Sequence, residues 1–143
     1  MAELPPIIKR QFEGINNRDA DAMAADMDPD METRAPGLGV QRGIEAFRAF
    51  GEAFFVAFPD ATITADRVVD QGDVVVVEGH YTGTHTGPLI GAQGEVPPTG
   101  RRRSLPFCDV YMLRDGKIAA HHVYFDQMEL LGQLGLTAGA ASS

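Results

Sequence analysis

The sequence predicts a single α+β domain in which helices cover one face of a curled antiparallel sheet. Apolar residues recur at helical spacing in the first part of the chain, and strand-like segments dominate from Pro59 onward. The later segments also contain Asp115-Gly116, a strong two-residue hairpin signal. Helices followed by consecutive strands are typical of the α+β class. The length of 143 residues is that of one domain, 1–143, with a substantial core.

Two helices are expected near the N-terminus. The first follows Pro5-Pro6, because Ile8, Phe12 and Ile15 stand at i, i+4 and i+7 and form one apolar stripe. The second covers 20–27, with Asp19 as its N-cap. The acidic residues around Pro29 that follow are interpreted as a solvated loop, since they lack the residue order of a calcium-binding loop.

The strongest helical pattern lies at 43–58 and is rich in phenylalanine. Its aromatic residues either fill the core or line a ligand pocket; the sequence favours the core and leaves both open. Strands are then expected at 62–69, 74–86, 103–113 and 117–125, with a long Gly/Pro loop between the second and third. A short helix at 126–134 and a frayed tail at about 137–143 complete the chain.

Composition excludes several classes of protein. With 12 basic and 20 acidic side chains, the net charge of −8 argues against a nucleic-acid partner or an anionic membrane surface. The run Arg101-Arg102-Arg103 is interpreted as solvated charge at a strand edge. No apolar run is long enough to span a membrane, and the N-terminus lacks a hydrophobic signal region, so a cytoplasmic location is expected.

The histidines do not form a metal-binding pattern. His80/His85 and His121/His122 are odd-spaced pairs whose side chains diverge on a strand, whereas a catalytic zinc needs about three convergent ligands. We therefore expect no metal site.

The segment 121–126 is the most informative candidate for catalysis. On an extended strand, His122, Tyr124 and Asp126 share one face, and residues 121, 123 and 125 share the other. If the polar face points into an apolar cavity, desolvation makes a carboxylate usable as an acid or base near neutral pH. A structural alternative exists for Asp126, because it also fits the N-cap of the closing helix, with Glu129 completing a capping box.

A second polar cluster lies at 78–84. Glu78 and His80 share a strand face with two threonines, and His85 follows on the opposite face. These groups could orient the oxygens of a substrate. Threonine is also a good strand former, so a purely structural interpretation stays open.

Several short motifs together resemble one family. They are the run 83–88 (Gly-Thr-His-Thr-Gly-Pro), 98–101 (Pro-Thr-Gly-Arg), 109–111 (Asp-Val-Tyr), 115–118 (Asp-Gly-Lys-Ile), 121–126 and 130–135. Their order and spacing resemble the SnoaL-like polyketide cyclases and the related ester cyclases over nearly the whole chain.

The resemblance implies a fold and an activity. It implies the nuclear-transport-factor-2-like superfold, a cone-shaped, strongly bent antiparallel sheet around helices and a deep apolar pocket. Cyclases of this family close a ring by intramolecular aldol condensation without metal or cofactor, and use an aspartate that corresponds by position to Asp126. Many relatives have Trp where this chain has His122, which indicates a pocket of different polarity.

The expected function is therefore a cofactor-free cyclase or lyase acting on a small apolar carbonyl compound. Asp126 would be the base, and His122 or His80 would donate a hydrogen bond to the developing enolate. We assign Tyr124, Glu78, Phe54, Phe58 and His85 to substrate binding. The alternatives are a non-catalytic carrier of a lipophilic ligand, in which the phenylalanines supply the affinity, or an isomerase, dehydratase or hydrolase of the same superfold.

A homodimer is expected from the same resemblance. Members of the superfold pair through the outer face of the sheet, and Phe107 and Tyr111 would otherwise expose aromatic surface there.

Overall fold

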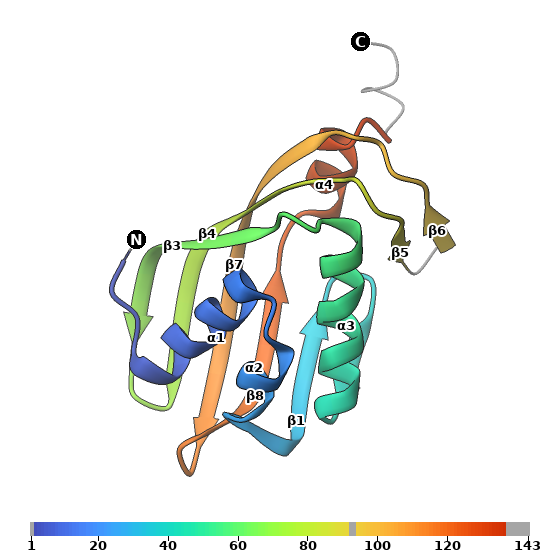
Figure 1. Ribbon diagram of the computed structural model, residues 1–143. Coiled ribbons are helices and arrows are strands. Elements are labelled where there is room, and N and C mark those ends of the chain that lie inside the picture. Colours follow the sequence, from blue (N-terminus) through green and yellow to red (C-terminus); the bar gives the residue numbers. More distant parts are fainter. Residues whose placement is uncertain (1, 92–93, 137–143) are drawn as a thin grey trace.

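A computed structural model describes residues 2–91 and 94–136 (Figure 1). The helices are α1 (Pro6–Asn17), α2 (Ala20–Ala24), α3 (Ile44–Ala57) and α4 (Gln127–Gln133). The strands are β1 (Met27–Ala35), β2 (Gly39–Arg42), β3 (Thr62–Asp70), β4 (Val74–Thr84), β5 (Leu89–Gly91), β6 (Gly94–Val96), β7 (Arg102–Arg114) and β8 (Lys117–Tyr124). The frayed tail expected at 137–143 lies outside the described residues.

Six strands form a curved sheet in the order β2-β1-β8-β7-β4-β3, and β5 pairs with β6 in a separate hairpin. Every neighbouring pair in the large sheet is antiparallel except β1 and β8, which run parallel. Helices α1, α2 and α3 cover the concave face, and α4 lies at one end of the sheet (Figure 1). The predicted α+β class is confirmed, with one parallel pair that local sequence patterns do not reveal.

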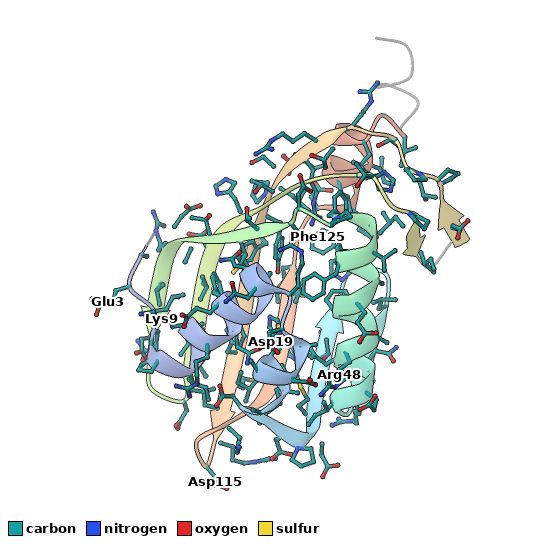
Figure 2. The ribbon with its side chains drawn as sticks, viewed as in Figure 1. Glu3, Lys9, Asp19, Arg48, Asp115 and Phe125 are labelled. Atoms are coloured by element: carbon teal, nitrogen blue, oxygen red, sulfur yellow. The ribbon has the colours of Figure 1, made fainter. Side chains whose placement is uncertain are left out.

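The helices form where their apolar stripes predict them. Ile8 and Phe12 of α1 are buried, and the Phe12 ring lies 6.3 Å from that of Phe107 on β7. Asp19 accepts a hydrogen bond from the Ala22 amide and so begins α2. Figure 2 shows Arg48 of α3 close to α2, where its guanidinium pairs with Asp21 at 2.7 Å.

The predicted helix at 20–27 is too long, and the loop expected after it is strand β1. Asp28, Pro29 and Asp30 are poor strand formers, so local propensity conceals the strand. Pairing of β1 with β8 and β2, and burial of Met31 and Thr33, decide its conformation. The β5–β6 hairpin was likewise expected to be loop.

Glycine permits the tight curvature of the β3–β4 pair. The register of this pair shifts between Ala65 and Arg67, which marks a β-bulge opposite Gly79. A Cβ built on Gly79 would lie 2.0 Å from the Thr64 carbonyl oxygen and 2.8 Å from the Phe107 ring. No side chain fits there without moving the backbone of β3.

We expect Gly79→Ala to destabilise the protein by about 3 kcal/mol, because over-packing at a rigid backbone contact forces the sheet apart. Chemical denaturation measures this change. Gly132→Ala is the matched control, since Gly132 lies in α4 and an added Cβ would meet nothing within 4 Å. That substitution should be neutral or stabilise by up to about 1 kcal/mol. Equal effects of both substitutions would contradict the assigned role of Gly79.

Candidate active site

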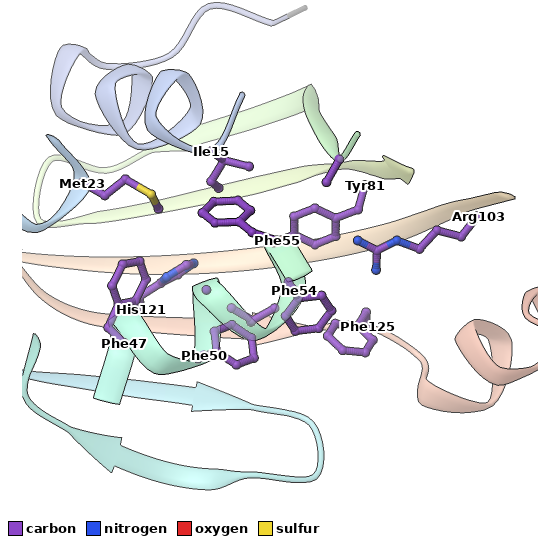
Figure 3. Close-up of a pocket in the computed structure, with 13 residues that line it drawn as sticks. Ile15, Met23, Phe47, Phe50, Phe54, Phe55, Tyr81, Arg103, His121 and Phe125 are labelled. Carbon is purple, nitrogen blue, oxygen red and sulfur yellow. The ribbon is translucent and has the colours of Figure 1, made fainter. Parts of the chain in front are cut away.

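An apolar cavity lies between helix α3 and the concave face of the sheet (Figure 3). Its volume is about 70 Å³. The polar side chains in its wall are Tyr81, Arg103 and His121. The remaining wall is formed by Ile15, Met23, Phe47, Phe50, Gly51, Phe54, Phe55, Ala61, Val123 and Phe125.

Strand alternation decides which residues of β7 and β8 reach this cavity. Along β7, residues 103, 105, 107, 109 and 111 are all buried. On β8, the side chains of His121 and Val123 point inward, and Asp109 of β7 stands opposite Val123. The pleat of β7 that buries Leu105 and Phe107 therefore also buries Asp109, and the pleat of β8 that buries Val123 also buries His121.

His121 and Asp109 form a buried acid/base pair. His121 is 4% exposed and Asp109 is 0% exposed. The Nε2 atom of His121 lies 3.2 Å from Oδ2 of Asp109, and the imidazole stacks on the Tyr111 ring with 4.3 Å between centroids. Neither ring nitrogen makes an aligned hydrogen bond among the described residues. The approach of Nε2 to the carboxylate favours Nε2 as the protonated nitrogen and Nδ1 as the basic one. The pair leaves one basic nitrogen available to a ligand.

Two tyrosines support the carboxylate. The hydroxyls of Tyr81 and Tyr111 donate long hydrogen bonds of 3.5 and 3.4 Å to Oδ2 of Asp109. Burial, and secondarily the charge of Asp109, raises the pKa of both hydroxyls well above the ordinary value of tyrosine. Both therefore stay protonated at neutral pH and remain donors to Asp109.

Arg103 lies at the opposite end of the cavity from His121 (Figure 3). It is 2% exposed, and its guanidinium carbon lies 3.7 Å from the centroid of the Phe58 ring. The rings of Phe54 and Tyr81 lie near the same group, at 5.4 and 5.7 Å. Burial lowers the pKa of Arg103 to about 10, which leaves the group charged at neutral pH. The cavity thus has a base at one end and a cation at the other, with aromatic walls between them.

A larger groove adjoins this cavity on the other side of α3. Its volume is about 330 Å³, and it shares Phe50, Phe54 and Phe125 with the inner cavity. The Phe54 ring meets the other two edge to face, with its centroid 5.1 Å from that of Phe50 and 6.4 Å from that of Phe125. They separate the two compartments.

The structure places Asp126 outside the cavity, at the N-cap of α4. Its side chain is exposed, and Oδ1 accepts hydrogen bonds from the amides of Met128 and Glu129 at 2.9 and 3.3 Å. The contacts of Asp126 are therefore those of a helix N-cap, which is the structural role considered for it in the sequence analysis. The expectation that the even-numbered face of β8 lines the pocket is wrong, because the inward residues are 121 and 123 and the pocket also takes Phe125.

The other residues expected to share that face point outward. His122 bonds to Glu32 at 2.7 Å, and Tyr124 is 46% exposed. The His122 contact lowers the pKa of the Glu32 carboxyl. On β4, His80 pairs with Asp66, and Glu78 is exposed and 3.4 Å from a nitrogen of Arg67.

Three predicted binding residues lie at or beside the cavity. Phe54 lines it, and Phe58 is buried under the Arg103 guanidinium. His85 is buried against Phe58, where Nδ1 accepts a hydrogen bond from the Thr99 amide at 3.2 Å. Burial, followed by the charge of Arg103, lowers the pKa of His85. The phenylalanines of α3 thus serve both as core and as pocket wall.

Sequence reasoning missed Asp109, His121 and Arg103 as site residues. The signal was present in the alternation of β7, since Arg103 and Asp109 have the same parity as Leu105, Phe107 and Tyr111. The interpretation of Arg103 as solvated edge charge is wrong for the same reason. The expectation that Phe107 and Tyr111 form an exposed aromatic face is also wrong, because both are buried in the core. The homodimer, which that expectation supported, stays a prediction.

Within residues 2–91 and 94–136, no group of three or more His, Cys, Asp or Glu side chains converges as a metal site would require. The helices of the same residues include none long and apolar enough to cross a membrane.

Comparison with known proteins defines the class of this chain. The sequence profile described as SnoaL-like polyketide cyclase matches residues 7–134. The chain therefore belongs to the SnoaL-like polyketide cyclase family. No curated protein matched the sequence.

Solved structures share the fold. IdmH of Streptomyces antibioticus, described as a candidate polyketide cyclase, is 29% identical, with a TM-score of 0.77 over 90% of this chain and 96% of its own. A candidate SnoaL-like cyclase of Jannaschia sp. CCS1 is 24% identical, with a TM-score of 0.80 over 94% and 97%. A Catenulispora acidiphila protein with a ketosteroid isomerase-like fold is 17% identical, with a TM-score of 0.78 over 96% and 98%.

We expect Asp126→Ala to lower the free energy of unfolding by about 1 kcal/mol, because two amides at the start of α4 lose their acceptor. Asp126→Asn should retain most of that stability, since asparagine is an equally good N-cap. Thermal and denaturant unfolding of both variants measures the difference. Equal losses in the two variants would show that the charge of Asp126, not its capping bonds, is what matters.

Proposed function

We propose that this protein catalyses cyclase-type aldol chemistry on a small apolar carbonyl compound, with His121 as the acid/base residue and Asp109 as its positioning residue. One observation carries the proposal. An imidazole with an unoccupied basic nitrogen, backed by a buried carboxylate, lines a cavity whose wall is otherwise almost entirely apolar. Membership of the polyketide cyclase family supports the same chemistry.

The proton transfers follow from this arrangement. Nδ1 of His121 accepts a proton from the carbon next to a substrate carbonyl, and the electron pair moves to the carbonyl oxygen as an enolate. The enolate carbon then forms a bond to a second carbonyl carbon of the same molecule, whose oxygen becomes an alkoxide. The imidazolium returns its proton to that alkoxide, so no net proton is gained or lost. Asp109 stabilises the imidazolium between the two transfers.

The cavity walls favour ring closure over reaction with water. Phe47, Phe50, Phe54 and Phe55 of α3 exclude water and hold an apolar chain folded, so the two reacting carbons are kept close. Low polarity also strengthens the interaction between the imidazolium and the carboxylate.

The competing function is a non-catalytic carrier of a lipophilic ligand. The apolar wall favours it, because such a wall binds a ligand without any chemistry. A carrier, however, does not need a buried charged carboxylate beneath an imidazole, since burying that group without a use lowers stability. The two functions differ in whether bound ketones exchange protons.

Proton exchange tests the proposal without knowledge of the natural substrate. Phenylacetone is incubated in D₂O with the protein, and NMR follows loss of the protons next to its carbonyl. We expect the wild type to accelerate exchange and His121→Gln to reduce that acceleration by about 100-fold or more, because the proton acceptor is removed. A carrier would bind phenylacetone and give no acceleration in any variant.

The neighbouring histidine separates this assignment from the one predicted by sequence. His122→Gln changes the same residue type one position along β8, on the outer face beside Glu32. If His122 or Asp126 were the acid/base residue, His122→Gln or Asp126→Asn would abolish exchange and His121→Gln would not. We expect the opposite pattern.

Asp109→Asn should lower the exchange rate at least 10-fold without unfolding the protein, because the amide keeps the shape of the carboxylate but no longer stabilises the imidazolium. The pH dependence of the rate must also change, which a purely structural role of Asp109 would not produce. An unchanged pH profile together with an unchanged rate would contradict its role as positioning residue.

A further inference from the structure

The guanidinium of Arg103 has no polar partner among the described residues, although burial makes an unpaired charge costly. Its Nε and Nη1 atoms are buried and have no hydrogen-bond partner among the described residues. An arginine side chain that is 98% buried is ordinarily paired with a carboxylate. Here the ring of Phe58 covers one face of the group at 3.7 Å, and its edge points to the cavity (Figure 3).

The nearby acidic groups are engaged elsewhere. Asp60 binds the backbone amide and hydroxyl of Thr84 at 2.7 and 2.9 Å. Asp109 is paired with His121 and receives the hydroxyls of Tyr81 and Tyr111. Neither carboxylate makes a salt bridge to Arg103 within the described chain.

From this geometry we infer that Arg103 is an anion subsite, and that the ligand of this cavity carries a carboxylate or an ionised 1,3-dicarbonyl group at the end away from His121. The inference gives the substrate class of the proposed function. It depends on that function only where the ligand is called a substrate. A planar pair of oxygens matches the fork of N–H donors on arginine, and both unpartnered atoms are then satisfied.

The aromatic rings make the subsite selective for oxygen anions on an apolar body. Phe54, Phe58 and Tyr81 surround the guanidinium and exclude the water that would compete for its donors. The overall charge of −8 does not attract anions from a distance, so recognition depends on this one cation.

A matched pair of probes tests the inference by binding alone. Cinnamate and cinnamamide have the same shape and differ in charge, and calorimetry measures their affinities for the wild type. We expect cinnamate to bind about 100-fold more tightly, since charge-assisted bidentate bonds replace unpaired donors. Arg103→Met keeps the length and apolar contacts of the side chain and should abolish this preference. A wild type without the preference, or an Arg103→Met variant that keeps it, would overturn the proposal.

Thermal unfolding and NMR of the arginine side chain provide two further tests of the anion subsite. Arg103→Met should raise the melting temperature by about 4 °C or more, because an unpaired buried charge is removed. A fall of that size would mean that the folded protein already satisfies the guanidinium, and would overturn the proposal. On the wild type, the ¹⁵N signal of the Arg103 Nε–H should shift with cinnamate and stay in place with cinnamamide; an unmoved signal with bound cinnamate would equally overturn it.

The failure of the proposed function can be recognised separately. His121→Gln should keep the preference for cinnamate over cinnamamide, because the carboxylate binds at Arg103, at the other end of the cavity. If phenylacetone exchange fails in every variant while the cinnamate preference depends on Arg103, the anion subsite stands and the protein is a carrier of acidic apolar ligands.

Discussion

The pleat of strand β7 places the charged side chains of the candidate site inside the core of this protein. Successive side chains of a strand point to opposite faces, so burial of Leu105, Phe107 and Tyr111 also buries the other two residues of the same series, Arg103 and Asp109. Because β7 is paired on both sides, with β4 and β8, it cannot rotate these charges outward without losing its hydrogen bonds. The molecule must therefore accommodate an anion and a cation inside a single apolar layer.

The two charges are accommodated differently, and the difference has a functional meaning. Oδ2 of Asp109 is contacted by His121 and by two tyrosine hydroxyls whose raised pKa keeps them as donors, whereas Oδ1 has no hydrogen-bond partner among the described residues. Arg103 receives mainly aromatic faces, which offset only part of the cost of burying a charge. Tyr81 joins the two ends, since its hydroxyl reaches Asp109 and its ring lies near Arg103. Asp109 thus has charged and polar neighbours within the protein, whereas Arg103 has no polar partner among the described residues; the proposed function and the proposed anion subsite rest on this difference.

Helix α3 closes the concave side of the curved sheet and so forms a cavity between the helix and the sheet. Its phenylalanines at 47, 50, 54 and 55 close the cavity from the concave side, and Phe50 and Phe54 also wall the outer groove. The bulge opposite Gly79 bends β3 and β4, and Phe107 packs closely against that glycine. The fold is shared with members of the SnoaL-like polyketide cyclase family, and in this chain the polar side chains of the cavity wall are Tyr81, Arg103 and His121.

Apolar periodicity and a hairpin turn are local signals, so the sequence alone predicts the fold class, helices α1 and α3, and the positions of β3, β4, β7 and β8. The family follows from the resemblance of its short motifs. The sequence did not reveal β1, whose aspartates and proline disfavour a strand, since the pairing of β1 with β8 is a long-range contact. Nor did it show which residues face the cavity: Asp126, His122 and His80 were chosen for their chemistry and, for Asp126, from the family resemblance, and the structure places them outside the cavity. Which face of a strand points inward depends on what packs against it. A shift of one residue exchanges the two faces, so only the tertiary structure could choose His121 over His122 and bury Arg103.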